Sequence, residues 1–363
     1  MRNKKMKVLL IILAILATLI VAVVIYVHTP KFGRAPRGER LERIQKSPNY
    51  HDGRFWNLES TPTITDQQHT HPFLDFLLQN RENRKPPEPI EVVKSDLKSL
   101  PEDSDYIVWF GHSSYLLQID GTRFLVDPVF YSGSPVSFVN RSFPMTYRYL
   151  PADMPDIDYL VITHDHWDHL DYKSVKELKP KVKRVLCPLG VGEHFERWKF
   201  DKSQLVEMDW NESSVSDIHK SLTLHCLPQR HFSGRLGGSN TLWASFLIES
   251  GEKKVFLGGD GGYGKHFKAI GDQFGPIDLA ILENGQYSEG WPYIHTLPKY
   301  LLLEIKDLQA KNVMTVHHGK FALSHHSWDE PYKTEQQLAK DTSFHLLNSP
   351  MGAVVFLDYE SNR

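Results

Sequence analysis

Histidine and aspartate crowd into one short segment of the chain, His-Asp-His-Trp-Asp-His at positions 164–169. Imidazole nitrogens and carboxylate oxygens are suitable ligands for zinc. His164 and His166 are two residues apart and Asp168 and His169 follow directly, so a single loop offers four donors that two neighbouring metal ions can share. A histidine-rich surface loop is the alternative, but the HxHxDH pattern is specific. We therefore predict a metal site on this loop.

Two ions need more ligands than one loop supplies, and further donors follow later apolar runs. His231 comes shortly after LTLHCL, Asp260 follows KVFLGG, and His317 follows NVMTV. Donors that directly follow strands are expected on one rim of a sheet. Four glycines around Asp260, at 258, 259, 261 and 262, are expected to let the backbone pass close to a metal and its substrate.

The elements that must position these residues are short apolar, β-branched runs that alternate with helix-like stretches. This alternation predicts an α/β layered fold, and the sheet is expected to be mixed because hairpins come first and helix crossovers later. The expected strands are 106–110, 115–119, 123–127, 158–163, 184–187, 222–227, 242–248, 254–258, 278–283 and 312–316. The expected helices are Tyr172–Leu178, Tyr263–Gln273 and Pro298–Leu308.

Together with these donors, further motifs make the chain resemble the metallo-β-lactamase superfamily. The motifs are WFGHSS (109–114), VDPVF (126–130), HDHWDHLDYKSV (164–175), PLG (188–190), PQRH (228–231), GGDGGY (258–263), FGPIDLA (274–280) and HHGKFAL (317–323). Within that superfamily the chain is most similar to N-acylphosphatidylethanolamine-hydrolysing phospholipases D, over about residues 105–360. The resemblance implies an αββα sandwich of two mixed sheets with outer helices and metals at one edge.

The resemblance also implies the ligand sets. One zinc ion would be held by His164, His166 and His231, the other by Asp168, His169 and His317, and Asp260 would bridge them. Asp127 is expected to orient a ligand. His112 and His295 would either contact substrate or serve structure. The chain departs from the family's pattern at Trp167, where tyrosine is expected, and at Ile294, where a polar residue would precede His295; these departures concern the lipid bound, not the hydrolytic centre.

The amino-terminal region predicts a membrane anchor. Residues 8–27 carry no charge and would span about 30 Å as a helix. A cleaved signal peptide is the alternative, but its apolar region is usually shorter and no Ala-x-Ala follows. Basic residues flank both ends, so orientation is contested; we favour a catalytic domain outside the cytoplasm. We divide the chain into an anchor (1–27), an extension (28–100) and a hydrolase domain (101–363).

The extension is expected to be a stalk or an arm wrapping the main domain. It contains a short apolar run, Phe73–Leu78, and a stiff KPPEP segment at 85–89. The net charge of −2 excludes a field that attracts nucleic acid. The two cysteines, Cys187 and Cys226, are expected to be buried rather than to form a disulfide scaffold. A homodimer is one assembly that the sequence allows without deciding.

These features predict a membrane-anchored dinuclear zinc hydrolase, with iron and manganese as the alternative metals. Metal-activated water would cleave a phosphodiester, releasing N-acylethanolamine and phosphatidic acid from N-acylphosphatidylethanolamine. Asp165 or Asp168 would move the proton, and Asp260 and His295 complete the expected catalytic set. Apolar residues in 130–150, among them Phe130, Phe138 and Phe143, would line an acyl groove or cover the core. A lactonase or esterase, and a non-catalytic metal-binding scaffold, are the alternative functions.

Overall fold

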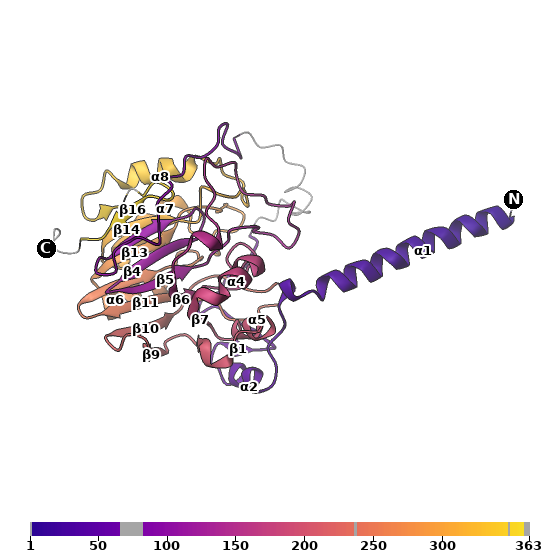
Figure 1. Ribbon diagram of the computed structural model, residues 1–363, viewed down its shortest axis with the longest axis horizontal. Helices are drawn as coiled ribbons and strands as arrows, with labels where there is room; N and C mark the ends of the chain where they lie inside the picture. The colour runs from indigo at the N-terminus through magenta and orange to yellow at the C-terminus, as the bar shows by residue number, and fades with distance from the viewer. Residues whose placement is uncertain (1, 66–82, 236–237, 348, 359–363) are drawn as a thin grey trace.

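Two mixed β-sheets stack face to face in the computed structural model, which describes residues 2–65, 83–235, 238–347 and 349–358 (Figure 1). Each sheet has seven strands. In spatial order the first comprises β16 (Val354–Phe356), β3 (Tyr106–Trp109), β4 (Tyr115–Ile119), β5 (Thr122–Val126), β6 (Ile157–Val161), β7 (Val182–Pro188) and β8 (Leu205–Met208). The second comprises β15 (His345–Leu346), β14 (Ala310–Val316), β13 (Ile277–Glu283), β12 (Lys253–Leu257), β11 (Ser245–Ser250), β10 (Leu222–Leu227) and β9 (Ser213–Val215).

Both sheets change from antiparallel to parallel pairing partway across. In the first, β16, β3, β4 and β5 pair antiparallel, and β5 to β8 pair parallel. In the second, β9 to β12 pair antiparallel and β12 to β15 pair parallel. The expected mixed α/β sandwich is therefore confirmed, with hairpins joining most antiparallel neighbours and helices joining most parallel ones.

Side-chain alternation along the second sheet explains why both of its faces are covered. Phe246 and Ile248 of β11 belong to the core between the sheets, whereas Leu247 belongs to a separate apolar cluster on the outer face. Successive side chains of a strand point to opposite faces. Leu301 of α7 and Phe267 of α6 cover that outer face.

The three helices predicted from the sequence are present, with bounds that differ from the predicted ones by at most two residues. Helix α4 spans Tyr172–Leu178 as expected, α6 spans Lys265–Phe274 and α7 spans Pro298–Asp307. Helices α5 (Gly192–Arg197) and α8 (Glu330–Leu338) were not predicted. Short 3₁₀ turns lie at Pro30–Phe32, Pro151–Asp153, Lys179–Lys181 and Lys202–Gln204.

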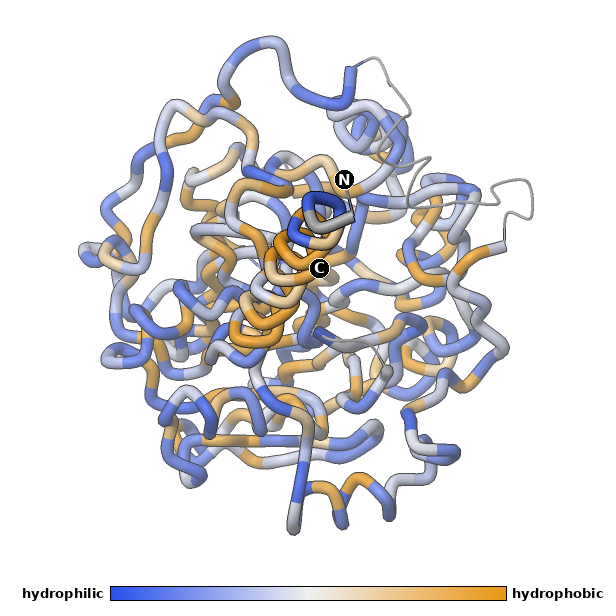
Figure 2. The backbone as a smooth tube through the Cα atoms, turned by 90° about the vertical axis from the view of Figure 1, so that its right-hand side faces the viewer, coloured by the Kyte–Doolittle hydropathy of each residue, from blue (hydrophilic) through white to orange (hydrophobic). Residues whose placement is uncertain are grey.

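Helix α1 (Arg2–Val27) projects away from the sandwich (Figure 1), and Figure 2 looks along it onto the face from which it emerges. Its segment Lys4–Val27 is long and apolar enough to cross a membrane, and none of that apolar window is buried against the rest of the chain. These criteria are equally met by a signal sequence near an amino terminus.

The described part of the extension lies along the main domain rather than standing away from it. It contains α2 (Glu39–Gln45) and a small hairpin of β1 (Tyr50–His51) and β2 (Arg54–Phe55). Asn57 exchanges two hydrogen bonds with the backbone of His231, and Val93 N donates to Met351 O at 2.8 Å. We call residues 28–65 and 83–100 the arm. The run Phe73–Leu78 lies outside the described residues.

Candidate metal centre

All seven metal donors expected from the sequence reach one edge of the sandwich, where several strands end. The 164–169 loop follows β6, and Asp171 closes it by accepting hydrogen bonds from the backbone nitrogens of Lys173 and Ser174 at the start of α4. His231, Asp260 and His317 follow β10, β12 and β14, which run in the same direction. Parallel strands bring loops at their carboxyl ends together, which is where α/β folds place ligands.

The first ligand group consists of His164, His166 and His231. Nδ1 of His166 lies 2.9 Å from Nε2 of His164 and 3.2 Å from Nε2 of His231. Around a tetrahedral zinc ion with bonds of about 2.0–2.1 Å, ligand nitrogens stand about 3.3 Å apart. His231 Nδ1 lies 2.7 Å from Ile294 O, to which it can donate, leaving Nε2 with a free electron pair. The three nitrogens thus converge as ligands of one ion would.

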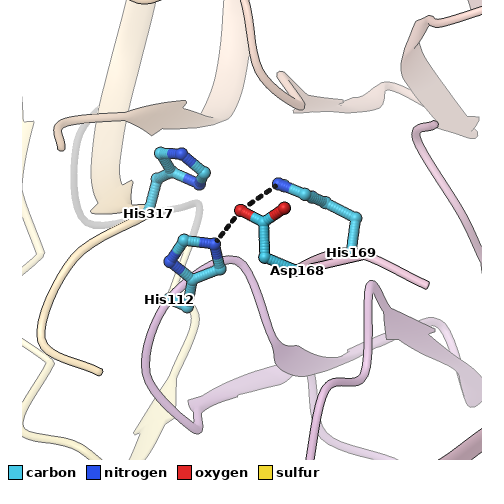
Figure 3. A group of neighbouring side chains, drawn as sticks. All are labelled: His112, Asp168, His169 and His317. Atoms are coloured by element: carbon cyan, nitrogen blue, oxygen red, sulfur yellow. Dashed lines mark hydrogen bonds and ion pairs between the residues drawn. The ribbon is translucent and has the colours of Figure 1, made fainter. Parts of the chain in front are cut away.

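The second group comprises His112, Asp168, His169 and His317 (Figure 3). Asp168 Oδ2 lies 2.9 Å from His112 Nε2 and 3.6 Å from His169 Nε2. His112 comes from the turn between β3 and β4, so this group draws on three separate parts of the chain. His112 is more than a neighbour of the site: its nitrogen lies within ligand distance of the others.

Asp260 lies between the two groups. Its Oδ2 is 3.0 Å from His169 Nε2 and 4.0 Å from Nε2 of both His164 and His231. Its Oδ1 is 3.1 Å from His317 Nδ1. A carboxylate has two oxygens and can serve two ions, and Asp260 faces both groups at once.

The residues present fit a bound metal pair, because several donor atoms are buried without partners. Among the described residues, His169 Nε2, His317 Nε2 and Asp260 Oδ1 are buried polar atoms that make no hydrogen bond. The 3.0 Å approach of His169 Nε2 to Asp260 Oδ2 lacks hydrogen-bond geometry. An unpartnered buried polar atom costs about 1–3 kcal/mol, so a cation that satisfies several of them is stabilising.

Burial and like neighbours set the protonation of these groups. Burial lowers the pKa of His164 and His231 well below the ordinary value, and nearby imidazoles lower them further. Burial also lowers the pKa of His166 to about 4. His169 is the exception: burial is outweighed by Asp260, Asp168 and Asp127, which raise its pKa well above the ordinary value. Neutral imidazoles carry the free electron pairs that metal binding requires.

Asp127 makes the contact expected of it. Its Oδ2 accepts from His169 Nδ1 at 2.8 Å, which fixes the ring and directs Nε2 into the centre. Ser113 Oγ lies 2.9 Å from His317 Nδ1, the same nitrogen that faces Asp260 Oδ1. Three non-glycine residues here have left-handed backbone angles, at φ 39° for Asp127, 53° for His112 and 70° for His317. Such strain is concentrated at functional sites.

Glu283, the last residue of β13, was missed as a site residue. Burial raises its pKa well above the ordinary value, and its Oε2 lies 3.1 Å from Nδ1 of His295. Glu283, His295, Asp260 and His317 form a further group of potential ligands. The available signal was an acidic residue closing an apolar strand, DLAILE, just as Asp260 and His317 follow theirs.

Asp165 is not brought into any of these groups. Its Oδ1 accepts from Gly234 N at 2.7 Å, and its Oδ2 lies 2.9 Å from both His194 Nε2 and Thr241 Oγ1. Although burial opposes it, the contact with His194 holds the pKa of Asp165 well below its usual range. Both oxygens are therefore committed to structural contacts, which disfavours the expected proton shuttle at this residue.

The glycines around Asp260 lie directly against neighbouring segments of the protein. A Cβ on Gly262 would lie 2.4 Å from the backbone of Tyr293, and one on Gly261 would lie 2.5 Å from the Gln229 side chain. These glycines let protein segments approach one another. The close approach at Gly262 holds the segment that carries His295 against the Asp260 loop.

The apolar residues of 130–150 differ in their exposure to solvent. Phe130 and Phe143 are buried, so they belong to the core. Phe138 and Val139 are 69% and 42% exposed, among the more exposed large apolar residues outside α1. Cys187 and Cys226 are buried free thiols, as expected.

Histidines and carboxylates at the ends of β3, β6, β10, β12, β13 and β14 lie together at one edge of the sandwich. This arrangement is typical of metal-dependent enzymes with an αββα fold. A family model described as a β-lactamase superfamily domain matches residues 122–318. The chain therefore belongs to the metallo-β-lactamase superfamily, whose fold holds a dinuclear metal site, and its fold and site class are those of a metal-dependent hydrolase.

The chain is similar to two curated relatives, and one solved structure shares its fold. An uncharacterised protein of Mycobacterium tuberculosis is 38% identical over 296 residues, covering 79% of this chain and 78% of its own. The N-acyl-phosphatidylethanolamine-hydrolyzing phospholipase D 1 of Caenorhabditis elegans is 32% identical over 266 residues, 67% of this chain and 74% of its own. The diiron β-hydroxylase CmlA of Streptomyces venezuelae superposes with a TM-score of 0.53 at 20% identity, over 71% of this chain and 54% of its own.

Proposed function

We propose that the chain is a membrane-anchored dinuclear zinc phosphodiesterase that cleaves N-acylphosphatidylethanolamine into N-acylethanolamine and phosphatidic acid. The observation that carries the metal part is the convergence of the His164 and Asp168 groups on the buried, partly unpartnered Asp260. The substrate part is supported by the likeness to the nematode phospholipase D. The CmlA likeness makes iron the metal that elemental analysis has to distinguish from zinc.

The ligand sets that we propose are those expected from the family resemblance. His164, His166 and His231 would hold one zinc ion, Asp168, His169 and His317 the other, and Asp260 would face both. Two zinc ions, when bound, supply a water of lowered pKa and neutralise charge on the phosphate oxygens. His112 and Glu283 join the proposal as added groups close enough to contact a ligand or hold it in place.

Asp168 and His295 are the proposed groups for proton transfer. Their side chains are 17% and 14% exposed, whereas those of His169 and Asp260 are at most 2% exposed. A group that exchanges protons with the leaving alkoxide must reach both the centre and the substrate. Asp168 lies against His112 and His169, and His295 lies against Glu283, so each has a partner that can hold it in orientation.

The proposed membrane anchor is α1, with the arm and the hydrolase domain following it. The segment just after the helix is built into the domain: Arg34 N donates to His194 Nδ1 at 3.1 Å, and Trp198 Nε1 donates to Pro30 O at 2.6 Å. These contacts fix the start of the arm to the domain, so a retained α1 would be held at a set position relative to it. We place the domain outside the cytoplasm, and leave a homodimer as an assembly to be measured by light scattering in detergent.

The test is made on the full chain, purified in detergent without chelator. Bound metals are counted by elemental analysis, and release of N-acylethanolamine from N-acylphosphatidylethanolamine is assayed beside Asp260→Asn. Two zinc ions per chain with release that the variant abolishes would support the proposal. Two zinc ions without release would redirect the assay to lactones and other phosphodiesters, and fewer than one metal per chain would overturn the metal centre.

A further inference from the structure

The loop at 131–142 presents apolar side chains to solvent at its tip. Phe138 is 69% exposed and Val139 is 42% exposed, whereas the loop begins beside Phe130, which is buried. The loop contains no acidic residue, and Arg141 near its end is exposed. Adjacent exposed aromatic and aliphatic side chains beside a basic residue suit a lipid surface rather than water.

The same loop is attached to the end of α1. Tyr26 Oη, one residue before the end of the helix, donates to Pro135 O at 2.6 Å. Lys31 Nζ in turn donates to Tyr26 Oη at 2.9 Å. Because the apolar span ends at Val27, Pro135 lies at the level where the helix would leave the hydrocarbon. Phe138 follows three residues later, within reach of the same plane.

The segment after α1 also contacts the loop that carries the proposed ligands. The ring of Phe32 meets that of Trp167 edge to face, with centroids 5.0 Å apart. The guanidinium of Arg235 lies 3.8 Å from the centre of the Trp167 ring and donates to Lys31 O at 3.0 Å. Arg235 also donates to Leu170 O at 2.7 Å. The end of the anchor and the metal loop are therefore held in one fixed arrangement.

The near end of the 131–142 loop reaches the metal centre itself. A Cβ on Gly133 would lie 3.1 Å from Asp168 Cβ and 3.4 Å from the Phe321 ring, so no side chain separates the loop from these residues. Gly133 lies five residues before Phe138 in the chain. One short loop thus connects the more exposed side of the centre with the exposed apolar tip.

We propose that the 131–142 loop inserts Phe138 and Val139 into the lipid surface in which α1 is anchored, so that the centre opens beside Asp168 directly onto the bilayer. This inference rests on the proposed function for its substrate, but the contact with lipid is a property of the surface alone. The loop would then lead a phospholipid head group from the bilayer past Gly133 to the centre. It also explains why the anchor is fixed to the domain instead of joined through a free linker.

The test places a fluorophore on the loop in the full chain. Cys187 and Cys226 are buried, so a surface-directed reagent labels an introduced Phe138→Cys. The labelled protein is reconstituted into phosphatidylcholine vesicles that contain acyl-brominated lipids, which quench only probes in contact with the acyl region. Val215→Cys is the matched control, because Val215 is 62% exposed but lies on β9 at the edge of the second sheet.

Severalfold stronger quenching at position 138 than at position 215 would support the proposal, and equal quenching at the two positions would overturn it. As a second variant, Val139→Asp in the labelled protein should reduce quenching at 138, whereas Val215→Asp should not. Quenching does not require turnover. Strong quenching without phospholipid hydrolysis would therefore support insertion of the loop and reject the proposed substrate. Hydrolysis without quenching would support the substrate and reject insertion of the loop.

Where hydrolysis is present, a kinetic measurement adds a second readout. The ratio of turnover on substrate in vesicles to turnover on a water-soluble phosphodiester should fall severalfold in Val139→Asp. An unchanged ratio would count against entry of lipid along this loop.

Discussion

The arm and the metal centre each gather acidic and basic side chains from distant parts of the chain, with opposite outcomes for their polar atoms. In the arm, Arg40 bonds the carboxylates of Glu193, Glu196 and Glu207, and its side chain is only 9% exposed. In the metal centre, Nε2 of His169, Nε2 of His317 and Oδ1 of Asp260 are buried without hydrogen bonds. Ion pairs in which every charged group has a partner hold two segments of the chain together. Buried polar atoms that converge without hydrogen-bond partners are instead suited to bind a ligand.

A high density of charged side chains does not by itself identify a metal-binding or ligand-binding site. The three carboxylates around Arg40 outnumber it, but Arg34 and Arg37 also pair with Glu193, so three arginines face three glutamates. At the metal centre, no side chain among the described residues forms a hydrogen bond with the unpartnered atoms of His169, His317 and Asp260. The predictions below separate these two kinds of cluster by their effects on activity, stability and metal content.

The largest effect is expected from Asp260→Asn. An amide cannot supply two anionic oxygens, so we expect loss of hydrolysis beyond the ~10–100-fold that is typical when a partner of a ligand is removed. Bound metal should also fall below two ions per chain, measured by elemental analysis. Full metal content with full activity would show that Asp260 is not part of the centre.

The next effect concerns folding rather than catalysis. Arg40→Ala leaves the buried carboxylate of Glu207 without its ion-pair partner, which typically costs ~3–5 kcal/mol of unfolding free energy. Denaturant unfolding of the full chain in detergent measures it. Arg43→Ala is the matched control: Arg43 and Glu212 are 44% and 46% exposed, and exposed pairs contribute ~0–1 kcal/mol. Metal content should stay unchanged in both variants; a drop would make the arm part of the metal centre.

Removal of metal should lower stability by a smaller amount. Free metal at 100 times its dissociation constant stabilises a folded protein by ~2.7 kcal/mol, which chelation would remove. Thermal unfolding before and after chelation measures the change. Zinc should restore the melting temperature, whereas magnesium should not, because nitrogen-rich sites favour zinc. Unchanged melting after complete removal would contradict a folded-state metal site.

The smallest effect is expected at Asp127→Asn. Loss of the charge that accepts from His169 Nδ1 should weaken metal affinity by ~10–100-fold while the fold remains. Competition with a chelator of known affinity measures it. Asp158→Asn is the control, because Asp158 is also a buried aspartate of this sheet but pairs with Lys183. Equal loss of affinity in both would assign the effect to the sheet rather than to the ligand.

Much of the fold could be predicted because its strands are buried. The ten apolar runs identified in the sequence correspond to β3–β7 and β10–β14, since a continuous apolar run has to be covered on both faces. The missed strands are edge strands such as β9, whose sequence Ser-Ser-Val carries no apolar pattern. Strand β9 is defined by its backbone hydrogen bonds to β10, and these bonds leave no pattern in the sequence of β9.

The site could be predicted where ligands are adjacent in sequence or directly follow a strand. His164, His166, Asp168, His169, Asp260 and His317 met that condition, and the structure brings them together with His231. Glu283 met it too, but was read as part of a strand. Asp165 illustrates the opposite error: it lies between two donors in sequence, yet successive side chains of the loop point different ways, and its oxygens face Gly234 and His194.

The sequence by itself determined the layered class, the positions of the buried strands, the apolar amino-terminal helix and a dense set of metal-type donors. Those properties depend on residue type and local spacing, which a chain carries before it folds. The tertiary structure alone decided which donors share a group, that His112 and Glu283 join them, and that the end of the helix meets Trp167 through Phe32. These depend on contacts between segments far apart in the chain, and only close packing of the folded core sets their distances.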